Sequence, residues 1–572
     1  MPKSRPLQPN APVSQWVSVI VMVIVAIISF QWLEESSERR HLIHPDEGRY
    51  AEIPREMVAS GDWVTPRING IKFFEKPPLQ YWATATAYGL FGDEYWVARL
   101  WPLLTGFAGL LACLYTSWRL YGKAVAVTAA GVLASALLYV VFAFVITLDM
   151  GLTFFLTASL MCFLLAQRAG ESARRERRWM LLAWALMACA MLSKGLIGLV
   201  LPAMVISAYV LSTRDWGLLR RLHIKTGVTV LLLITLPWIM LLQSRHPEFL
   251  RFFLFHEHFE RFTSNAHNRT GVPGYFVVVL GVGFMPWTPL LAVAVVRRLR
   301  HWRELLARHS SSDGRGVNAE RVLWLWAAVT LGFFSLSTAK LPAYILPMFP
   351  ALAILVALAA WQLPRRRLLL VIAPTLLLAL FGLLALPTLR EYAVGRYPAE
   401  LIDGYLPGLR EALLWLASGA LFAMIFAWRN VRALSLGALA LGSFMAWDRV
   451  IANVDALAPS LSAVSLLQRA EQSNGGFAAD VPMFSVGMYD QTVPFYLKRK
   501  VVPVKYAGEL AMGMRLEPQL SLETVAQFRQ KWTELPRAYA IISAATYREM
   551  QADGWSAREL QKDTDRVIVA KP

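Results

Sequence analysis

The sequence predicts an α-helical protein that crosses a membrane about thirteen times and ends in a small α/β domain outside it. Hydrophobic residues make up 56% of the 572 residues and charged residues only 17%, against roughly 25% charged in soluble domains. A soluble core could not bury that much apolar surface, and a disordered chain would be more polar. Basic residues also recur after alternate apolar runs, as short cytoplasmic loops require.

Thirteen apolar runs define the expected transmembrane helices, because each has about the length needed to cross a bilayer. The first run, 15–32, is followed by charged residues rather than a small-residue cleavage site, which indicates an uncleaved anchor and not a signal peptide. The later helices are expected at 96–118, 124–147, 150–167, 179–193, 195–212, 226–243, 274–296, 322–339, 341–362, 368–388, 410–428 and 433–450.

The basic residues predict the orientation of these helices. Lysine or arginine follows every even-numbered helix, as Arg119 and Lys123 do after the second. Because short cytoplasmic loops are rich in these residues, we expect the N-terminus inside and the C-terminus outside. We attribute the formal charge of +18 first to these basic cytoplasmic loops. No nucleic-acid partner is expected.

Two domains follow from this organisation. Residues 1–450 form the membrane domain, with a long first outer loop at 33–95, and residues 451–572 form the outer domain. Three short apolar runs in the outer domain are separated by polar stretches of helical character, a pattern typical of a small α/β module. These runs are 482–486, 538–542 and 567–569.

Three long apolar runs each carry one ionisable residue near the midpoint, where the chain must turn on the outer face. These residues are Asp149, Lys194 and Lys340. One interpretation is that turns are simply where charges are tolerated. The other is functional, since ionisable groups near the membrane are costly and commonly serve a function.

The first outer loop contains an acidic pair, Asp46 and Glu47, at the start of a helical pattern. Tyr50, Ile53, Met57 and Val58 fall on one helical face, which predicts a short amphipathic helix on the membrane surface. The acidic residues have two interpretations. Asp46 could cap the helix and Glu47 could complement its dipole, or both could belong to a catalytic site.

Two further segments carry charges that could meet a substrate phosphate. Glu75 and Lys76 precede two prolines, and the lysine is either an anchor at the headgroup level or a cation for a lipid phosphate. The outer loop at 244–273 contains His256 and Arg261. Its histidines and carboxylates could hold a metal, whereas Arg261 could face phosphate.

These residues form one predicted constellation at the outer face of the membrane. Such a site suits an anionic substrate whose lipid tail lies among the helices. The chain has no Walker loop and no GxGxxG after a strand, so no nucleotide cofactor is expected and the energy must come with the substrate. The carboxylates are Asp46, Glu47 and Asp149, and the cations are Arg49, Lys76, Lys194, Arg261 and Lys340.

The first loop, HPDEGRYAEIPREMVASGDWVTPRINGIKFFEKPPLQYW, resembles that of bacterial 4-amino-4-deoxy-L-arabinose transferases of lipid A modification. These enzymes are C-type glycosyltransferases of the oligosaccharyl and protein mannosyl transferase-like superfamily. The segment STAKLPAYILP at 337–347 also resembles them. The resemblance extends over the whole chain and implies the C-type glycosyltransferase fold.

The resemblance also implies roles for individual residues. Asp46 and Asp149 match the family's acidic residues, and Glu47 is the alternative carboxylate beside the first. Lys76 resembles the lysine that binds the carrier phosphate, with Arg49 and Arg261 as helpers, and Glu75 and His256 match positions that can bind zinc. Tyr344 resembles a residue of the lipid pocket. Tyr50, Lys194 and Lys340 complete the expected substrate-binding set, whereas Phe73 and Phe74 stand where relatives can have a tyrosine.

The implied activity is transfer of 4-amino-4-deoxy-L-arabinose from undecaprenyl phosphate to a lipid A phosphate at the periplasmic face of the inner membrane. Resistance to polymyxin and other cationic antimicrobial peptides would follow. A related transferase could move mannose or galacturonic acid to protein or lipopolysaccharide core. A lipid transporter is a weaker alternative, because transporters more often show repeats and midplane charges, and a structural envelope protein is a third class.

Overall fold

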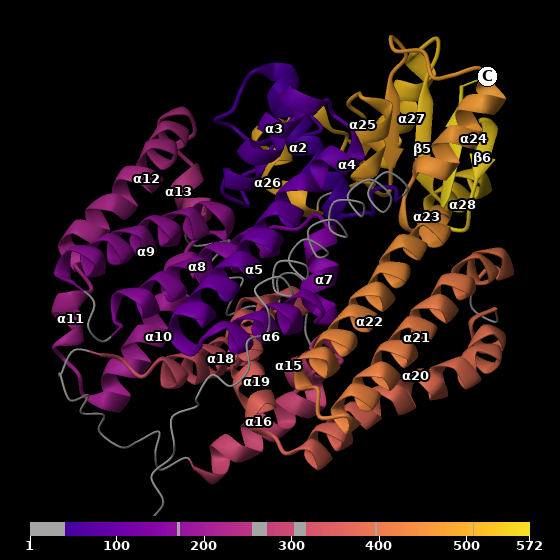
Figure 1. Cartoon of the computed structure of the whole chain (residues 1–572). Helices are drawn as coiled ribbons and strands as arrows, with labels where there is room; N and C mark the ends of the chain where they lie inside the picture. The colour runs from indigo at the N-terminus through magenta and orange to yellow at the C-terminus, as the bar shows by residue number, and fades with distance from the viewer. Residues whose placement is uncertain are drawn as a thin grey trace, which may run out of the picture.

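The computed structural model describes residues 40–168, 172–253, 272–301, 316–394, 397–506 and 508–571. The long helices form one bundle, and the C-terminal strands and helices gather at one end of it, beside the first-loop helices α2 and α3 (Figure 1). The expected first span, 15–32, lies outside the described residues. The architecture confirms the predicted fold class, a polytopic helical protein with a small sheet-containing C-terminal domain.

In the described part of the chain, eight helices are long and apolar enough to cross a membrane, or nine if one bent pair counts as a span. The helix count of thirteen therefore stays a prediction. The expected segments 179–193 and 195–212 are also helical, as α9 (Ala173–Lys194) and α10 (Ile197–Thr213). The long spans contain α5 (Leu100–Tyr121), α8 (Asp149–Ala166), α12 (Ile224–Arg245), α18 (Ala319–Leu336), α19 (Phe349–Gln362), α20 (Arg365–Val394), α21 (Ala399–Trp428) and α22 (Arg432–Ala452).

Two expected single helices are broken, which corrects the prediction for 124–147 and 274–296. The first is α6 (Lys123–Ala134) and α7 (Leu137–Phe144), bent by 63°, and the second is α15 (Tyr275–Gly283) and α16 (Thr288–Arg300). Polar groups at one break form hydrogen bonds with polar groups at the other. The Leu137 amide donates to the carbonyl of Met285 at 3.2 Å, and the Trp287 indole donates to the Ser135 hydroxyl at 2.9 Å. Non-helical backbone is tolerated at membrane depth when it is buried in protein in this way.

The residues between the helices expected at 368–388 and 410–428 form no long loop, because most of them are helical. Helices α20 and α21 have 30 residues each, or about 45 Å, so they extend beyond the hydrocarbon layer of roughly 30 Å. Arg390 and Asp403 join the two extensions through a hydrogen bond of 2.6 Å. The apolar pattern ends where the bilayer ends, so it could not reveal the helical continuation.

The first-loop helix forms where it is expected, as α2 (Asp46–Ser60), and it is buried in protein on more than its apolar face. Its polar face is buried too: Glu52 and Glu56 are 0% and 7% exposed. The helix is enclosed by α3 (Leu79–Phe91) and by the C-terminal domain. A Cβ atom at Gly48 would lie 2.6 Å from the backbone of Gln491, so glycine permits this close approach.

A hairpin fastens the first loop to the C-terminal domain. Strands β1 (Arg67–Ile68) and β2 (Ile71–Lys72) flank Asn69 and Gly70, both with positive φ, as a tight hairpin turn requires. The Asn69 amide group donates to the Val501 carbonyl at 2.6 Å and accepts from the Val501 amide at 2.7 Å. These bonds hold the loop and the C-terminal domain together.

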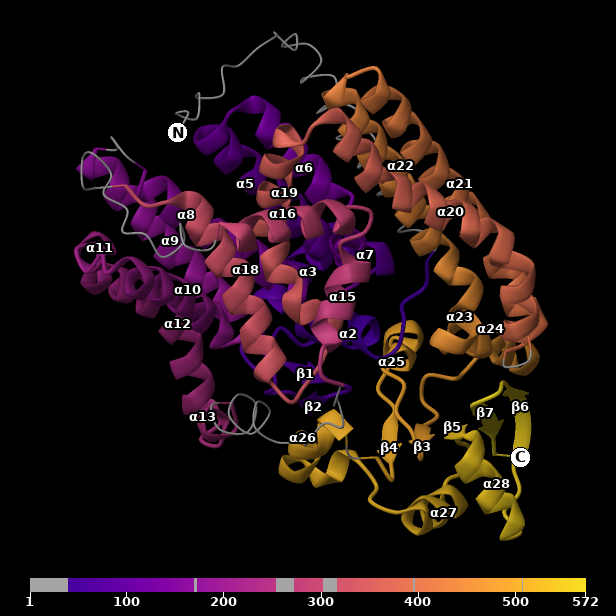
Figure 2. The ribbon, with the colours of Figure 1, turned by 90° about the horizontal axis from the view of Figure 1, so that it is seen from below.

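The C-terminal domain is built on a five-stranded sheet of order β4-β3-β5-β7-β6. The three predicted apolar runs correspond to β3, β5 and β7. Helix α24 (Val464–Asn474) covers one face, while α27 (Val525–Glu534) and α28 (Ala544–Ala552) cover the other (Figure 2). The strands are β3 (Met483–Val486), β4 (Val502–Val504), β5 (Tyr539–Ser543), β6 (Arg558–Lys562) and β7 (Arg566–Ala570).

Short helices join the longer elements. Four of them connect membrane helices or first-loop segments, and the rest lie in or before the C-terminal domain. They are α4 (Tyr95–Ala98), α11 (Leu218–Arg221), α13 (Phe249–Arg251), η2 (Pro342–Met348), η3 (Asn453–Leu457), α23 (Ala458–Leu461), α25 (Thr492–Leu497), η4 (Gly508–Leu510), α26 (Ala511–Leu516) and η5 (Pro518–Leu520).

Candidate active site

Asp46 is the first residue of α2, and its carboxylate remains accessible. The residue that precedes the helix is Pro45, and no side chain caps the helix, so the capping interpretation of Asp46 is wrong. Its side chain is 45% exposed and lies 3.6 Å from the Arg49 guanidinium. A carboxylate that is held near a cation but still exposed can meet a substrate group.

Arg49 joins the first loop to the C-terminal domain. Its Nη2 donates to Glu509 Oε2 at 3.0 Å, and the Gln491 amide donates to the other oxygen of Glu509. The guanidinium also lies over the rings of Tyr50 and Phe73, at 5.5 and 6.0 Å. Glu509 and Gln491 could not be predicted as site residues, because no local pattern in the sequence connects the C-terminal domain with the first loop.

Tyr50 lies among three of the predicted acidic residues. Burial raises the pKa of its hydroxyl, and the charges of Asp46, Glu75 and Asp149 raise it further, against the opposing effect of Arg49. The hydroxyl therefore stays protonated and can donate a hydrogen bond. The charges of all three carboxylates act on this one hydroxyl. The fold therefore brings Asp46, Glu75 and Asp149 together from three separate segments of the chain.

Asp149, Lys194 and Tyr344 meet although they come from three different turns. Asp149 begins α8 and Lys194 ends α9, so each charge complements the dipole of its own helix. The two side chains form an ion pair, and the Lys194 ammonium lies 5.1 Å from the centre of the Tyr344 ring. Their side chains are only 11% and 18% exposed, so solvent screens this pair weakly.

Lys340, the third of these turn residues, has a structural environment instead. Its ammonium donates to the carbonyls of Phe334, Ser335 and Ser337 at 3.1, 2.7 and 2.6 Å. These carbonyls lie at the C-terminal end of α18, where backbone acceptors lack helical partners. The interpretation of Lys340 as a charge tolerated at a turn is thus favoured over a substrate-binding role.

Glu47 is closed within a cage of positive groups and is 1% exposed. Arg40 donates to it at 2.6 Å and Arg99 at 3.0 Å, and the amides of Ile43 and Ile146 also donate to it. Burial alone would raise the pKa of Glu47, but the two guanidiniums lower it to about 2. This geometry favours a structural role over a catalytic one. No pattern in the sequence indicated Arg40 or Arg99 as its partners.

Glu75 and Lys76 lie in the turn that leads into α3. Lys76 is 8% exposed, and its ammonium donates to the Glu75 carbonyl at 3.1 Å and lies 4.0 Å from the Glu75 carboxylate. Arg261 and His256, the other predicted ligands of phosphate and metal, lie outside the described residues. Among the residues that are described, no three His, Cys, Asp or Glu side chains form a metal-binding group, so zinc stays a prediction.

The architecture is shared with membrane glycosyltransferases. The family described as dolichyl-phosphate-mannose-protein mannosyltransferase matches residues 17–253. A solved oligosaccharyltransferase from Archaeoglobus fulgidus superposes with a TM-score of 0.50 at 13% identity, covering 96% of this chain and 73% of its own, which shows the fold alone. The fold and the site define the chain as a membrane protein of the C-type glycosyltransferase class.

More similar proteins identify the family. The aminoarabinose transferase C-terminal domain matches residues 470–571. The undecaprenyl phosphate-alpha-4-amino-4-deoxy-L-arabinose arabinosyl transferase of Erwinia tasmaniensis is 30% identical over 72% of this chain and 74% of its own. The ArnT crystal structure from Cupriavidus metallidurans, described as bound to undecaprenyl phosphate, has a TM-score of 0.87 at 35% identity, covering 97% and 98% of the two chains. The chain belongs to this aminoarabinose transferase family.

Some alignments with relatives are shorter. The arabinosyl transferase of Edwardsiella ictaluri is 31% identical over 322 residues, which are 56% of this chain and 55% of that protein. The chain thus spans little more than half the length of the curated relatives that match in this way.

Proposed function

We propose that this protein transfers 4-amino-4-deoxy-L-arabinose from undecaprenyl phosphate to a phosphate of lipid A, at the periplasmic face of the bacterial inner membrane. The observation that carries the proposal is the near-complete structural likeness to the Cupriavidus protein, which is described as bound to undecaprenyl phosphate. The clustering of Asp46, Glu75 and Asp149 around Tyr50 supports it.

The proposed reaction is a substitution at the first carbon of the sugar. A lipid A phosphate oxygen forms a bond to this carbon, the bond to undecaprenyl phosphate breaks, and its electron pair leaves with the carrier phosphate. Lys76, Arg49 and Arg261 stabilise the departing phosphate, an electrostatic role. Glu75 and His256 are proposed zinc ligands, and a metal beside Lys76 would neutralise the same phosphate.

The acceptor phosphate is already anionic, so it needs no general base. We assign Asp46 and Asp149 to orienting the acceptor or to binding the ammonium group of the sugar. The exposed carboxylate of Asp46 suits this role. If the acceptor were a hydroxyl, Asp46 would be the natural base. A wild-type rate that does not change between pH 5 and 8 would argue against the base role, with Asp46→Asn as the comparison.

The test is mass spectrometry of lipid A from a bacterium that makes the aminoarabinose carrier but lacks its own transferase. The strains carry empty vector, the wild-type gene or Asp46→Asn. We expect an added aminoarabinose mass with the wild type alone. A well-expressed, correctly inserted wild-type protein that adds no mass would contradict the proposal, and other polyprenyl-linked sugars would then be tested.

A further inference from the structure

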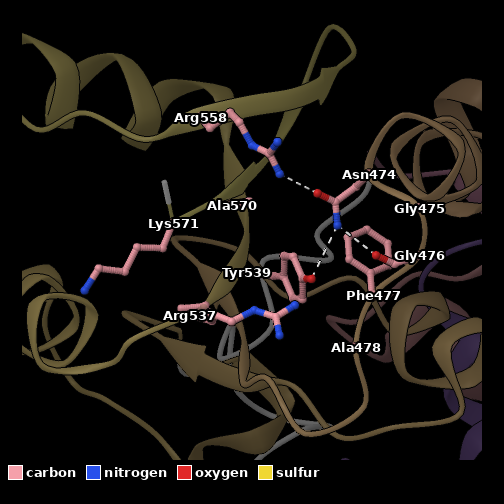
Figure 3. Close-up of a pocket in the computed structure, with 11 residues that line it drawn as sticks. Asn474, Gly475, Gly476, Phe477, Ala478, Arg537, Tyr539, Arg558, Ala570 and Lys571 are labelled. Carbon is pink, nitrogen blue, oxygen red and sulfur yellow. Dashed lines mark hydrogen bonds between the residues drawn. The ribbon is translucent and has the colours of Figure 1, made fainter.

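A pocket of about 440 Å³ lies in the C-terminal domain, and none of its lining residues belongs to the candidate active site (Figure 3). This volume falls within the range of about 300–1,000 Å³ typical of small-molecule sites. The pocket lies between the loop that follows α24 and the ends of three strands. We call it the C-terminal pocket; its lining residues are Asn474–Ala478, Arg537–Tyr539, Arg558, Ala570 and Lys571.

The register of the sheet places three of the lining residues side by side. Ala570 on β7 pairs with Tyr539 on β5 and with Arg558 on β6, so these three residues form one row across the sheet. Directly paired residues project from the same face. The small alanine lies between two long side chains, at the end of the sheet where α24 ends at Asn474.

The walls of the pocket are held in place by hydrogen bonds. Asn474 donates to the carbonyl of Gly476 at 2.7 Å and to the Tyr539 hydroxyl at 3.3 Å, and it accepts from Arg558 at 2.5 Å. These bonds fix the Arg558 guanidinium at the rim, as Figure 3 shows. The pocket is therefore oriented before any ligand arrives, which lowers the entropy cost of binding.

The pocket is rich in hydrogen-bond donors. Burial would raise the pKa of Tyr539, yet donors from Asn474, the Ala478 backbone and Arg537 lower it, so the field at this hydroxyl is positive. Among the described residues, neither Arg537 nor Arg558 has a carboxylate within ion-pair distance. Lys571 belongs to a different contact, because its ammonium donates to the carbonyls at the end of α27 and points away from the pocket (Figure 3).

We propose that the C-terminal pocket binds the anionic group of a phosphorylated sugar, with Arg537 and Arg558 as its cations and Asn474 as the positioning amide. Arginine suits this role because its planar donors match the oxygens of phosphate. The volume exceeds the need of a single phosphate group, and the ring of Phe477, packed edge-on to Tyr539 at 5.0 Å, adds an apolar surface for the sugar.

The place of the pocket leaves two sources for such a ligand. Helix α24 runs from α23 away from the membrane helices (Figure 1). The pocket lies at the C-terminal end of α24, because Asn474 lines it. A free sugar phosphate could reach it from solution. So could a phosphorylated sugar in the projecting oligosaccharide of a membrane glycolipid, and this second source rests on the proposed function, since that glycolipid would be the acceptor.

The experiment measures binding of glucose 6-phosphate to the full-length protein in detergent by calorimetry, with glucose as the uncharged control. The variants are Arg537→Gln, Arg558→Gln, their combination, and Asn474→Asp, which has the same size but adds a negative charge and removes the two hydrogen bonds that the amide donates. Arg548→Gln on α28 is the matched control, because this arginine is exposed and lies outside the pocket.

We expect wild type and Arg548→Gln to bind glucose 6-phosphate but not glucose, and each pocket variant to bind at least about tenfold more weakly, as the loss of a charged hydrogen bond predicts. The two arginine variants and their combination should keep the wild-type melting temperature, because both arginines are exposed. Absence of binding to wild type, or equal binding by the double variant, overturns the free-ligand source.

A second arm compares lipopolysaccharide with enzymatically dephosphorylated lipopolysaccharide in nanodiscs. Binding that depends on both the phosphate and the two arginines identifies the glycolipid source and holds even if no sugar is transferred. If neither arm shows a ligand whose binding depends on Arg537 and Arg558, the proposal is wrong, whatever the lipid A assay shows.

Discussion

At the scale of single residues, Asp46 and Glu47 are neighbours with opposite environments. Asp46 is exposed at the start of α2, whereas Glu47 is enclosed by Arg40 and Arg99. Removing the charge of Glu47 leaves two buried guanidiniums without a negative partner, which lowers the free energy of unfolding by about 3–5 kcal/mol. We therefore expect Glu47→Gln to lower the melting temperature strongly, and Asp46→Asn to abolish transfer with little change in melting temperature. Thermal unfolding in detergent and the lipid A assay separate the two effects, and a stable but inactive Glu47→Gln protein would contradict this assignment.

Glu47 also predicts how stability depends on pH. Its pKa is about 2 in the folded protein and 4.5 ordinarily, so the folded state favours the ionised form. The stability from this ionisation is complete above pH 4.5 and is lost as the pH falls towards 2. The difference in melting temperature between wild type and Glu47→Gln should be constant from pH 5 to 7 and should shrink between pH 4.5 and 3. A difference that grows on acidification would contradict the assigned charge state.

The ion pair of Asp149 and Lys194 makes a prediction of coupling. Either Asp149→Asn or Lys194→Gln leaves a poorly exposed charge without its partner, so each should lower transfer activity. Because both act on one contact, the double variant should lose less than the two single losses combined, with a coupling of about 0.5–3 kcal/mol. The measurement is kcat/KM in a double-mutant cycle. Additive losses would show that the two residues act independently, and Lys340→Gln, which removes a charge from a helix-end contact, is the comparison.

At the scale of elements, the close contact between α2 and the C-terminal domain depends on one glycine. A Cβ atom at Gly48 would lie 2.6 and 2.7 Å from backbone atoms of Gln491 and Thr492, which cannot move as a flexible side chain could. We expect Gly48→Ala to lower the free energy of unfolding by about 1–3 kcal/mol. It should also lower activity, since displacing the backbone at Gln491 moves Glu509, its hydrogen-bond partner, away from Arg49.

The matched control for this variant is Gly89→Ala. Gly89 lies on α3, and a Cβ atom there would meet nothing within 4 Å. This change should be neutral or should stabilise the helix by about 0.5–1 kcal/mol. Unfolding and activity of the two variants are compared directly; equal stability of both would mean that the contact between α2 and α25 is not tight.

At the scale of the whole molecule, the orientation proposed from the basic loops can be tested with introduced cysteines. Glu523 in the C-terminal domain and Arg366 at the start of α20 are both exposed. The native Cys113 and Cys162 are buried and Cys189 is partly buried. In intact spheroplasts, we expect a membrane-impermeant maleimide to label Glu523→Cys and to label Arg366→Cys only after permeabilisation. The reverse pattern would place the candidate site on the cytoplasmic face.

The C-terminal domain contributes to the candidate site as well as forming a separate sheet. Its sheet could be predicted from three apolar runs, but its part in the candidate site could not. Glu509 reaches Arg49 across 460 positions of the chain, and residues so distant leave no local pattern. The same reason explains why Arg99, 52 positions from Glu47, was not recognised as its partner, and why the amphipathic α2 was expected on a membrane surface rather than beneath another domain. Arg40 is only seven positions from Glu47, but it lies before α2, so no helical spacing aligns the two.

The sequence by itself determined the membrane class, the positions of most long helices, three strands of the C-terminal sheet and the acidic pair of the first loop. These follow from composition, apolar length and residue period, which are local properties of the chain. Only the tertiary structure decided which charges share a site. It joined Asp149 to Lys194, turned Lys340 to a helix end, enclosed Glu47 and exposed Asp46. Packing assigns these partners, because the environment of a charge depends on segments that meet only when the chain folds.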